Sequence, residues 1–373
     1  MDVLFVGLLS ITWQQLVMIS LGCLLIYLAI AKEYEPALLL PIGFGAILVN
    51  IPFSAAIDQM SNGEKVHGVL NIFFDMGIMT EIFPLLIFVA VGAMIDFSPL
   101  LKKPSLLLFG AAAQFGIFFT MSAATLFGFS LKQAASIGII GAADGPTSIY
   151  VASRFAKDLL GPISVAAYSY MALVPIIQRP VIKALTTRKE RLIRMESQAK
   201  AVSKTVLIIF PISVTIIAGI IAPTSAALIG FLMFGNLIRE CGVLNKLSLS
   251  AQNELASIVT LLLGITIAST MTADKFLQPQ TLIIISLGLV AFVFDTAGGV
   301  LFAKFLNLFL KQKINPMVGA AGISAFPMSA RVIHKLGQEE DPFNYLLMHA
   351  VSANVAGQIG SVIAGGLVLA LVV

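Results

Sequence analysis

A single carboxylate lies inside an apolar stretch in the first half of the chain. Asp144 stands in Gly141-Ala-Ala-Asp-Gly-Pro-Thr, and no other residue between positions 136 and 153 carries a charge. A carboxylate at membrane depth costs several kcal/mol, so such residues usually face a cavity, a partner or a coupling ion. We therefore expect Asp144 to serve an ion or substrate pathway. The alternative is a structural cap at the start of a helix.

A second Gly/Pro-interrupted stretch lies in the other half of the chain, Asn315-Pro-Met-Val-Gly-Ala-Ala-Gly-Ile-Ser-Ala-Phe-Pro-Met-Ser-Ala-Arg331. Helices that unwind at Gly and Pro free carbonyl groups, and these suit a hard cation when a carboxylate and other oxygens lie nearby. Na+ fits that description, and the two stretches offer it the side-chain oxygens of Asp144, Thr147, Asn315 and Ser324. Arg331 could hold a small carboxylate in bidentate fashion. The alternatives are a helix cap for Asn315 and an interfacial position for Arg331.

The composition places both stretches in a membrane. Of the 373 residues, 58% are hydrophobic and 11% are charged, against roughly 25% charged in soluble domains. The mean hydropathy is +0.98. A spanning helix needs about 20 apolar residues, and we expect roughly ten to twelve membrane segments. Residues 1–12 lack the basic start and small-residue exit of a cleavable signal, so the first helix, near 14–31, should remain as an anchor.

Other chemistries find no support in the residue pattern. Cys23 and Cys241 lie in apolar context without ligand spacing, and the three histidines are scattered, so neither a disulfide nor a transition-metal site is predicted. The net charge of +4 comes from loops that flank apolar segments, which argues against nucleic acid as a partner. The densest basic cluster, at 183–204, predicts a cytoplasmic loop.

This basic loop divides the chain into two similar halves. The stretch that begins at Gly92 has an echo in the one that begins at Gly264. An Ile-Gly-Phe segment that ends on Asn precedes each of them, and a Gly-Ala-Ala element follows each. We therefore predict an N-terminal anchor at 1–35, a first repeat at 36–182 with a broken element at 132–157, a linker at 183–204, and a second repeat at 205–373 with a broken element at 314–335.

Matching breaks in two repeats are typical of secondary transporters, whose binding site lies at the midplane where the broken helices meet. The arms that flank each break are only about ten residues long, too short to span a membrane alone. The predicted fold is therefore an all-α polytopic membrane protein with two re-entrant or discontinuous elements. Inverted repeats are favoured if each re-entrant hairpin enters and leaves on one side, and parallel repeats if it crosses.

Four ordered motifs resemble the β subunit of biotin-dependent sodium-translocating decarboxylases. They are the two stretches above, Tyr170-Met-Ala-Leu-Val-Pro-Ile-Ile-Gln, and Thr186-Thr-Arg-Lys-Glu-Arg. The likeness covers nearly the whole chain. One departure is Arg179 in Gln178-Arg179-Pro180, where a second proline is expected. The resemblance implies a membrane subunit that decarboxylates carboxybiotin with proton uptake and couples this reaction to Na+ export.

The resemblance also assigns roles to single residues. It implies catalytic or coupling roles for Asp144, Tyr170 and Arg331, with Tyr170 and Arg331 near the carboxybiotin. Asp144 would bind Na+ and take a proton when Na+ leaves, Tyr170 could relay that proton or position Ser324, and Gly319 would permit close backbone approach. The Na+ site that the resemblance implies comprises Asp144, Asn315, Gly319 and Ser324, and the residue pattern adds Thr147 to it.

The resemblance further implies partners and a location. The partners are a biotin carrier, a carboxyltransferase, a small membrane subunit and further copies of this chain, as a trimer, in the cytoplasmic (inner) membrane of a prokaryote. The acyl substrate is left open, with a lean to the acyl-CoA types. A sodium-coupled carboxylate carrier without decarboxylase chemistry is the main alternative, and a structural scaffold is a third. Asp295, in a long apolar run, either faces a cavity or caps a helix.

Overall fold

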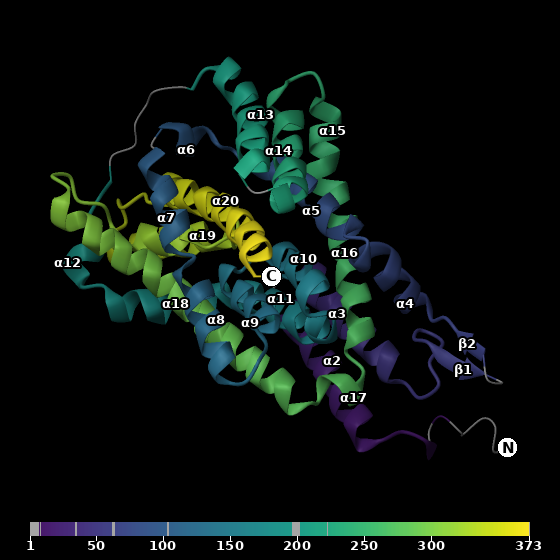
Figure 1. The fold of residues 1–373 in the computed structure, drawn as a ribbon. Coiled ribbons are helices and arrows are strands. Elements are labelled where there is room, and N and C mark those ends of the chain that lie inside the picture. Colours follow the sequence, from purple (N-terminus) through teal and green to yellow (C-terminus); the bar gives the residue numbers. More distant parts are fainter. Residues whose placement is uncertain are drawn as a thin grey trace.

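The computed structural model describes residues 7, 9–33, 36–61, 64–102, 104–195, 202–221 and 223–372. Helices dominate this part of the chain (Figure 1). A short antiparallel hairpin pairs Gln59 with Val66, between strands β1 (Gln59–Ser61) and β2 (Glu64–Val66). The predicted all-α polytopic fold is confirmed.

The first half consists of a helical pair, a broken helix and a break-containing segment, and it ends in a long helix. Its helices are α2 (Trp13–Ala31), α3 (Pro36–Asn50), α4 (Val69–Phe73), the π-helical η1 (Phe74–Met79), α5 (Ile82–Met94), α6 (Ser98–Lys102), η2 (Pro104–Leu106), α7 (Leu107–Ala112), α8 (Phe115–Leu126), α9 (Leu131–Gly138), η3 (Ile139–Ala142), α10 (Gly145–Phe155), η4 (Lys157–Leu159) and α11 (Leu160–Leu185).

The second half follows a short helix in the basic linker, α12 (Arg188–Arg191). Its elements are α13 (Lys204–Ile221), η5 (Pro223–Ser225), α14 (Ala226–Glu240), α15 (Asn245–Ser250), the π-helical η6 (Ala251–Leu255), α16 (Ala256–Ile267), η7 (Ala268–Thr270), α17 (Ala273–Phe276), α18 (Pro279–Phe309), η8 (Pro316–Gly322), α19 (Met328–Glu340) and α20 (Leu347–Leu371).

Six helices of the described chain are long and apolar enough to cross a membrane, and two bent pairs raise this number to as many as eight. One bent pair joins Val69–Met79 to Ile82–Met94 at 59°. The expected ten to twelve segments exceed this number because they include shorter pieces. Helix α3, for example, has only 15 residues, and about 20 are needed to span alone.

The two halves pack crosswise through their helical pairs. Helices α2 and α3 lie against each other and α3 packs on α16, whereas α13 and α14 lie together and α14 packs on α5. Two buried asparagines secure these contacts. Asn50 Nδ2 donates to the carbonyl of Met271 at 2.8 Å, and Asn236 Nδ2 donates to the carbonyl of Ile95 at 2.9 Å. Each asparagine thus binds a loop of the other half, which follows η7 in the case of Asn50 and α5 in the case of Asn236.

The two predicted breaks lie between the long helices α18 and α20. The first break joins η3 to α10, and the second runs from η8 to α19. Both α18 and α20 contact η3 and η8. Both breaks therefore share one pair of supporting helices, and this arrangement positions the candidate site.

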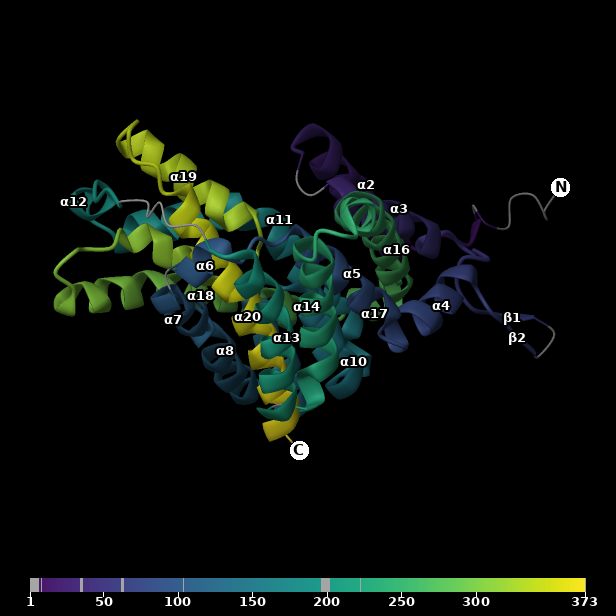
Figure 2. The ribbon, with the colours of Figure 1, turned by 90° about the horizontal axis from the view of Figure 1, so that it is seen from above.

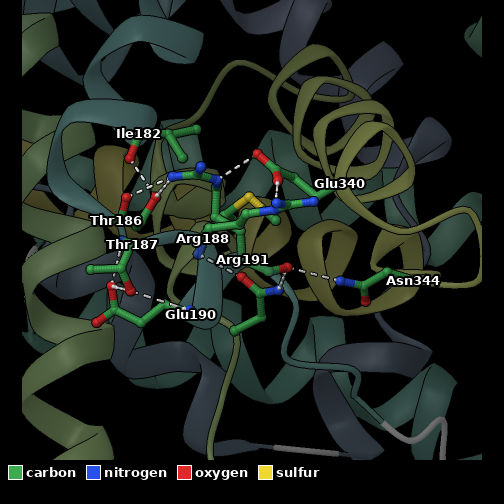
Figure 3. A network of polar contacts seen from close by, with 10 residues as sticks. Ile182, Thr186, Thr187, Arg188, Glu190, Arg191, Glu340 and Asn344 are labelled. Carbon is green, nitrogen blue, oxygen red and sulfur yellow. Dashed lines mark hydrogen bonds and ion pairs between the residues drawn. The ribbon is translucent and has the colours of Figure 1, made fainter.

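The basic linker and the β-hairpin lie at opposite ends of the molecule in both views (Figure 2). In the linker, Arg191 Nε donates to Glu340 at 2.7 Å, and the carbonyl of Arg191 accepts from Asn344 Nδ2 at 3.0 Å (Figure 3). Arg194 Nε donates to Asp341 at 2.6 Å. These contacts fix the linker to the end of α19. Residues 196–201 of the predicted linker lie outside the described part.

Candidate functional site

Asp144 begins α10 and is almost fully buried, with 3% of its surface exposed. The chain turns sharply just before it, because Ala143 adopts a left-handed conformation with φ of 53°. Asp144 Oδ1 then accepts a hydrogen bond from the backbone N–H of Thr147 at 3.1 Å. This bond is the helix-cap geometry of the structural alternative. The cap uses only one of the two carboxylate oxygens.

The second oxygen of Asp144 faces α20. Asp144 Oδ2 accepts from Ser361 Oγ at 2.7 Å and from Gln358 Nε2 at 3.2 Å. All donors to this carboxylate are neutral, and no basic side chain of the described residues forms an ion pair with it. A buried carboxylate with only neutral partners is well placed to attract a cation.

The two breaks meet directly. In a continuous helix the carbonyl of Ala142 would accept from the amide of residue 146, but Pro146 has no N–H to donate. The backbone N–H of Ser324, in the second break, donates to Ala142 at 2.9 Å instead. Ser324 Oγ donates to the carbonyl of Gly357 in α20 at 2.9 Å. The second break therefore replaces the hydrogen bond that the first break lacks.

Helix α20 contacts both breaks with one polar face. Asn354 Nδ2 donates to the carbonyl of Ile323 at 2.6 Å, while Gln358 and Ser361 contact Asp144. The spacing of four and three residues puts these three side chains on one side of the helix. Asn354 Oδ1 is buried and has no hydrogen-bond partner among the described residues. It is an oxygen donor free to bind a cation.

The two nearby tyrosines of α11 have different surroundings. A Cβ on Gly145 would lie 2.2 Å from the ring of Tyr168, so this ring packs directly against the residue that follows Asp144. The hydroxyl of Tyr170 donates to the carbonyl of Ile285 in α18. The ring of Tyr170 also lies beside Gly288. The structure thus places Tyr168 at the first break and Tyr170 against α18.

Asn315 and Gly319 lie at the start of the second break. Asn315 Oδ1 accepts from the N–H of Met317 at 3.1 Å, and its Nδ2 donates to the carbonyls of Arg191 and Ile193, each at 2.8 Å. The helix-cap alternative for Asn315 is therefore observed. A Cβ on Gly319 would lie 2.0 Å from the carbonyl oxygen of Gly299, so Gly319 permits the close approach of η8 to α18.

Arg331 lies on α19, and its side chain is exposed on the surface of the protein. Its side chain forms no hydrogen bond or ion pair with the described residues. Its guanidinium group is therefore available to a ligand.

The structure brings together some of the predicted site residues. Asp144, Thr147 and Ser324 meet where the breaks touch, whereas Asn315 holds the linker, Gly319 packs on α18, Tyr170 binds α18 and Arg331 is exposed. Sequence reasoning missed four buried neighbours, Tyr168, Asn354, Gln358 and Ser361. A signal for three of them exists in the sequence, because Asn354, Gln358 and Ser361 recur at helical spacing in an apolar run.

Known proteins are similar in sequence to this chain along nearly its full length. A family model described as Na+-transporting oxaloacetate decarboxylase beta subunit matches residues 14–372. The methylmalonyl-CoA decarboxylase subunit beta of Propionigenium modestum is 50% identical over 98% of this chain and 96% of its own. The glutaconyl-CoA decarboxylase subunit beta of Acidaminococcus fermentans is 50% identical over 98% and 95%. The oxaloacetate decarboxylase beta chain of Haemophilus ducreyi is 47% identical over 97% and 96%.

Proposed function

This chain belongs to the family of Na+-transporting oxaloacetate decarboxylase beta subunits, and we propose on that basis that it binds Na+ at Asp144 and couples Na+ export to the decarboxylation of carboxybiotin. It is a multi-pass membrane subunit of a decarboxylase complex. The proposed partners are a biotin carrier, a carboxyltransferase and a small membrane subunit, together with further copies of this chain. The proposed location is the cytoplasmic membrane of a prokaryote.

One observation carries the proposal for Na+. The carboxylate of Asp144 is buried, and its partners are a backbone amide, an amide side chain and a hydroxyl, all of them neutral. An ionised carboxylate without a cationic partner is expensive to bury, so a bound cation would offset that cost. Oxygen donors of the kind found here suit a hard cation.

The proposed Na+ shell draws on both breaks and on α20. Asp144 supplies the charge, and Thr147 and Ser324 supply hydroxyl oxygens. The unpartnered Oδ1 of Asn354 is the further proposed ligand. Asn315 and Gly319, predicted as ligands, are proposed instead to hold the second break in position, because their observed contacts are with the linker and α18. If both breaks supply ligands to Na+, binding and release of the ion would be coupled to the relative position of the two breaks.

The proposed chemistry is the loss of carbon dioxide from carboxybiotin. The bond between the biotin nitrogen and the carboxyl carbon breaks, carbon dioxide leaves, and a proton is taken up by the nitrogen. Arg331 is proposed to orient the carboxylate before this step, since a guanidinium group binds a carboxylate in bidentate fashion and the side chain is exposed. The proton is proposed to come from Asp144 when Na+ replaces it there, with Tyr170 or its neighbour Tyr168 on the path.

The crosswise packing supports two units related by a two-fold axis. Asn50 ends α3 and Asn236 lies four residues before the end of α14, and each binds a loop of the opposite half. Inverted repeats have such an axis in the membrane plane. We propose that the two halves are inverted and that the breaks face each other at the membrane midplane.

The decisive experiment is Asp144→Asn in the assembled complex, reconstituted in vesicles. We expect the variant to lose Na+-dependent carbon dioxide release from carboxybiotin and Na+ uptake into inverted vesicles, because asparagine keeps the helix cap but removes the charge. Asp158→Asn is the matched control, since Asp158 is exposed and accepts a hydrogen bond from Gln133. Full Na+-dependent activity in Asp144→Asn would overturn the proposal. Na+ uptake without carbon dioxide release in the wild type would favour the carrier.

A further inference from the structure

A second carboxylate is buried among the membrane helices. Asp295, in α18, has 0% of its surface exposed. Its Oδ1 accepts from the backbone N–H of Gly116. Its Oδ2 is buried and has no hydrogen-bond partner among the described residues. Basic side chains of the described part form no ion pair with it.

The cap that Asp295 provides does not explain its charge. Helix α8 starts after Gln114, whose side chain makes no capping bond, and Asp295 supplies an acceptor for the first turn from another helix. Asparagine caps a helix about as well as aspartate does, and it would carry no buried charge. The ionisable group and its unpartnered oxygen therefore require another explanation.

The unpartnered oxygen points at the first break. Oδ2 of Asp295 lies 2.4 Å from the position that a Cβ on Gly141 would occupy, so it touches the backbone three residues before Asp144. The stretch from Gly141 to Asp144 is thus flanked by Asp295 on the α18 side and by Gln358 and Ser361 on the α20 side. Two buried carboxylates border the same four residues.

Two threonines neighbour Asp295 or its partner Gly116 in the sequence of these helices. Thr296 follows Asp295 in α18, and Thr120 lies one turn after Gly116 in α8. Both hydroxyls are buried without a hydrogen-bond partner among the described residues. Carboxylate and hydroxyl oxygens are donors of the kind that a hard cation takes.

We propose that Asp295 binds a second Na+ beside the first break, an inference that rests on the proposed Na+-pumping function. The carboxylate supplies the charge through Oδ2, and the N-terminus of α8 holds the group in place through Oδ1. One turn further along α18, Gly299 contacts Gly319 of the second break. A Na+ bound at Asp295 would therefore affect α18, which supports both breaks.

The test is equilibrium binding of radioactive Na+ to the purified membrane complex in detergent. The wild type is expected to bind two ions per chain, and Asp295→Asn and Asp144→Asn are each expected to bind one. If Asp295→Asn binds as many ions as the wild type while Asp144→Asn loses one, the inference fails and the proposed function stands. If Asp144→Asn loses none, the proposed function fails, whatever Asp295→Asn does. A single site in the wild type also overturns the inference.

A second variant keeps the test valid if Asp295→Asn does not fold. Gly141→Ala retains every charge but places a methyl group against Oδ2 of Asp295, and we expect it to weaken one of the two sites about tenfold or more. Gly219→Ala in α13 is the matched control, because its Cβ would meet only Ala226 at 3.6 Å. Unchanged affinity at both sites in Gly141→Ala would contradict the inference.

Discussion

The two breaks of this molecule contact the same two helices, α18 and α20, but hold different groups. The first has the buried carboxylate of Asp144, and the arginine that follows it is occupied: Arg154 binds Glu81 at 2.9 Å and lies over the ring of Tyr150. The second contributes Ser324 and the exposed Arg331, and Asn315 ties it to the basic linker. The difference suggests a division of labour, in which the first break binds the ion and the second faces the carboxylated substrate.

The difference extends to how tightly each break is packed. In the second break Gly319 meets the backbone of Gly299, whereas in the first break Gly145 meets the side-chain ring of Tyr168. A backbone in a long helix cannot yield as a ring can. An added methyl group should therefore be less tolerated at Gly319 of the second break than at Gly145 of the first.

The largest expected effect comes from testing that difference in packing. Gly319→Ala would put a Cβ 2.0 Å from the Gly299 carbonyl and should destabilise the fold by about 3 kcal/mol or more. Gly145→Ala should cost about 1 kcal/mol, because the ring of Tyr168 can shift. The measurement is the midpoint of thermal unfolding of the purified complex, with Gly219→Ala as control. An equal decrease of the unfolding midpoint in the two variants would contradict the proposed difference in packing.

The next prediction distinguishes the role of Arg331 from that of Arg154. Arg331→Ala should raise the KM for carboxybiotin about tenfold or more through a lost bidentate contact, and leave the unfolding midpoint unchanged, because its side chain has no partner among the described residues. Arg154→Ala should leave the KM unchanged and lower the unfolding midpoint. Its ion pair with Glu81 is partly exposed and its stacking on Tyr150 is modest, so the loss of stability should be about 1 kcal/mol.

These two measurements are made on the same preparations. Steady-state decarboxylation gives KM and kcat, and thermal unfolding gives stability. Arg331→Lys serves as the conservative control and should recover only part of the KM, since lysine retains the charge without the bidentate geometry. If Arg154→Ala raised KM as much as Arg331→Ala, the division of labour between the breaks would be wrong.

Several of these features could be predicted from sequence and others could not, for physical reasons. Asp144 and both breaks leave local signals, since a lone carboxylate and closely spaced Gly and Pro residues are conspicuous in apolar helices. Gln358 and Ser361 recur at helical spacing, but such neutral residues are common in buried helices, so the contact of α20 with α10 is needed to assign them to Asp144. The contact of Ser324 with Ala142 joins residues more than 180 positions apart, and no local pattern predicts such a pair.

Neighbouring positions can also exchange roles without altering the sequence pattern. Tyr168 and Tyr170 stand in one apolar run, yet only Tyr168 packs on the residue after Asp144. A helical turn of 3.6 residues places two positions two apart on different sides of the helix. Asn315 illustrates the opposite case, because its two predicted uses, cap and ion ligand, need the same side-chain oxygen, and the structure shows the cap.

The smallest effect concerns the linker that holds the second break. Arg194 donates two hydrogen bonds to Asp341, at 2.6 and 3.0 Å, and these bonds lower the pKa of the Asp341 carboxyl. A group whose pKa is lower in the folded protein contributes stability above its unfolded pKa, about 3.9 for aspartate, and loses that contribution as the pH falls through the lowered value. The contact should therefore be unchanged from pH 8 to about pH 5 and be lost only in stronger acid.

Hydrogen exchange of residues 186–195 tests this pH dependence, once rates are corrected for the intrinsic effect of pH. Protection should stay constant over that range in the wild type, and Asp341→Asn should lower it at every pH, because asparagine keeps an acceptor but removes the charge that Arg194 needs. Since Asn315 binds the carbonyls of Arg191 and Ile193, a looser linker should also raise exchange in the second break but not in the first. Equal changes in both breaks would show that the linker does not act on the second break alone.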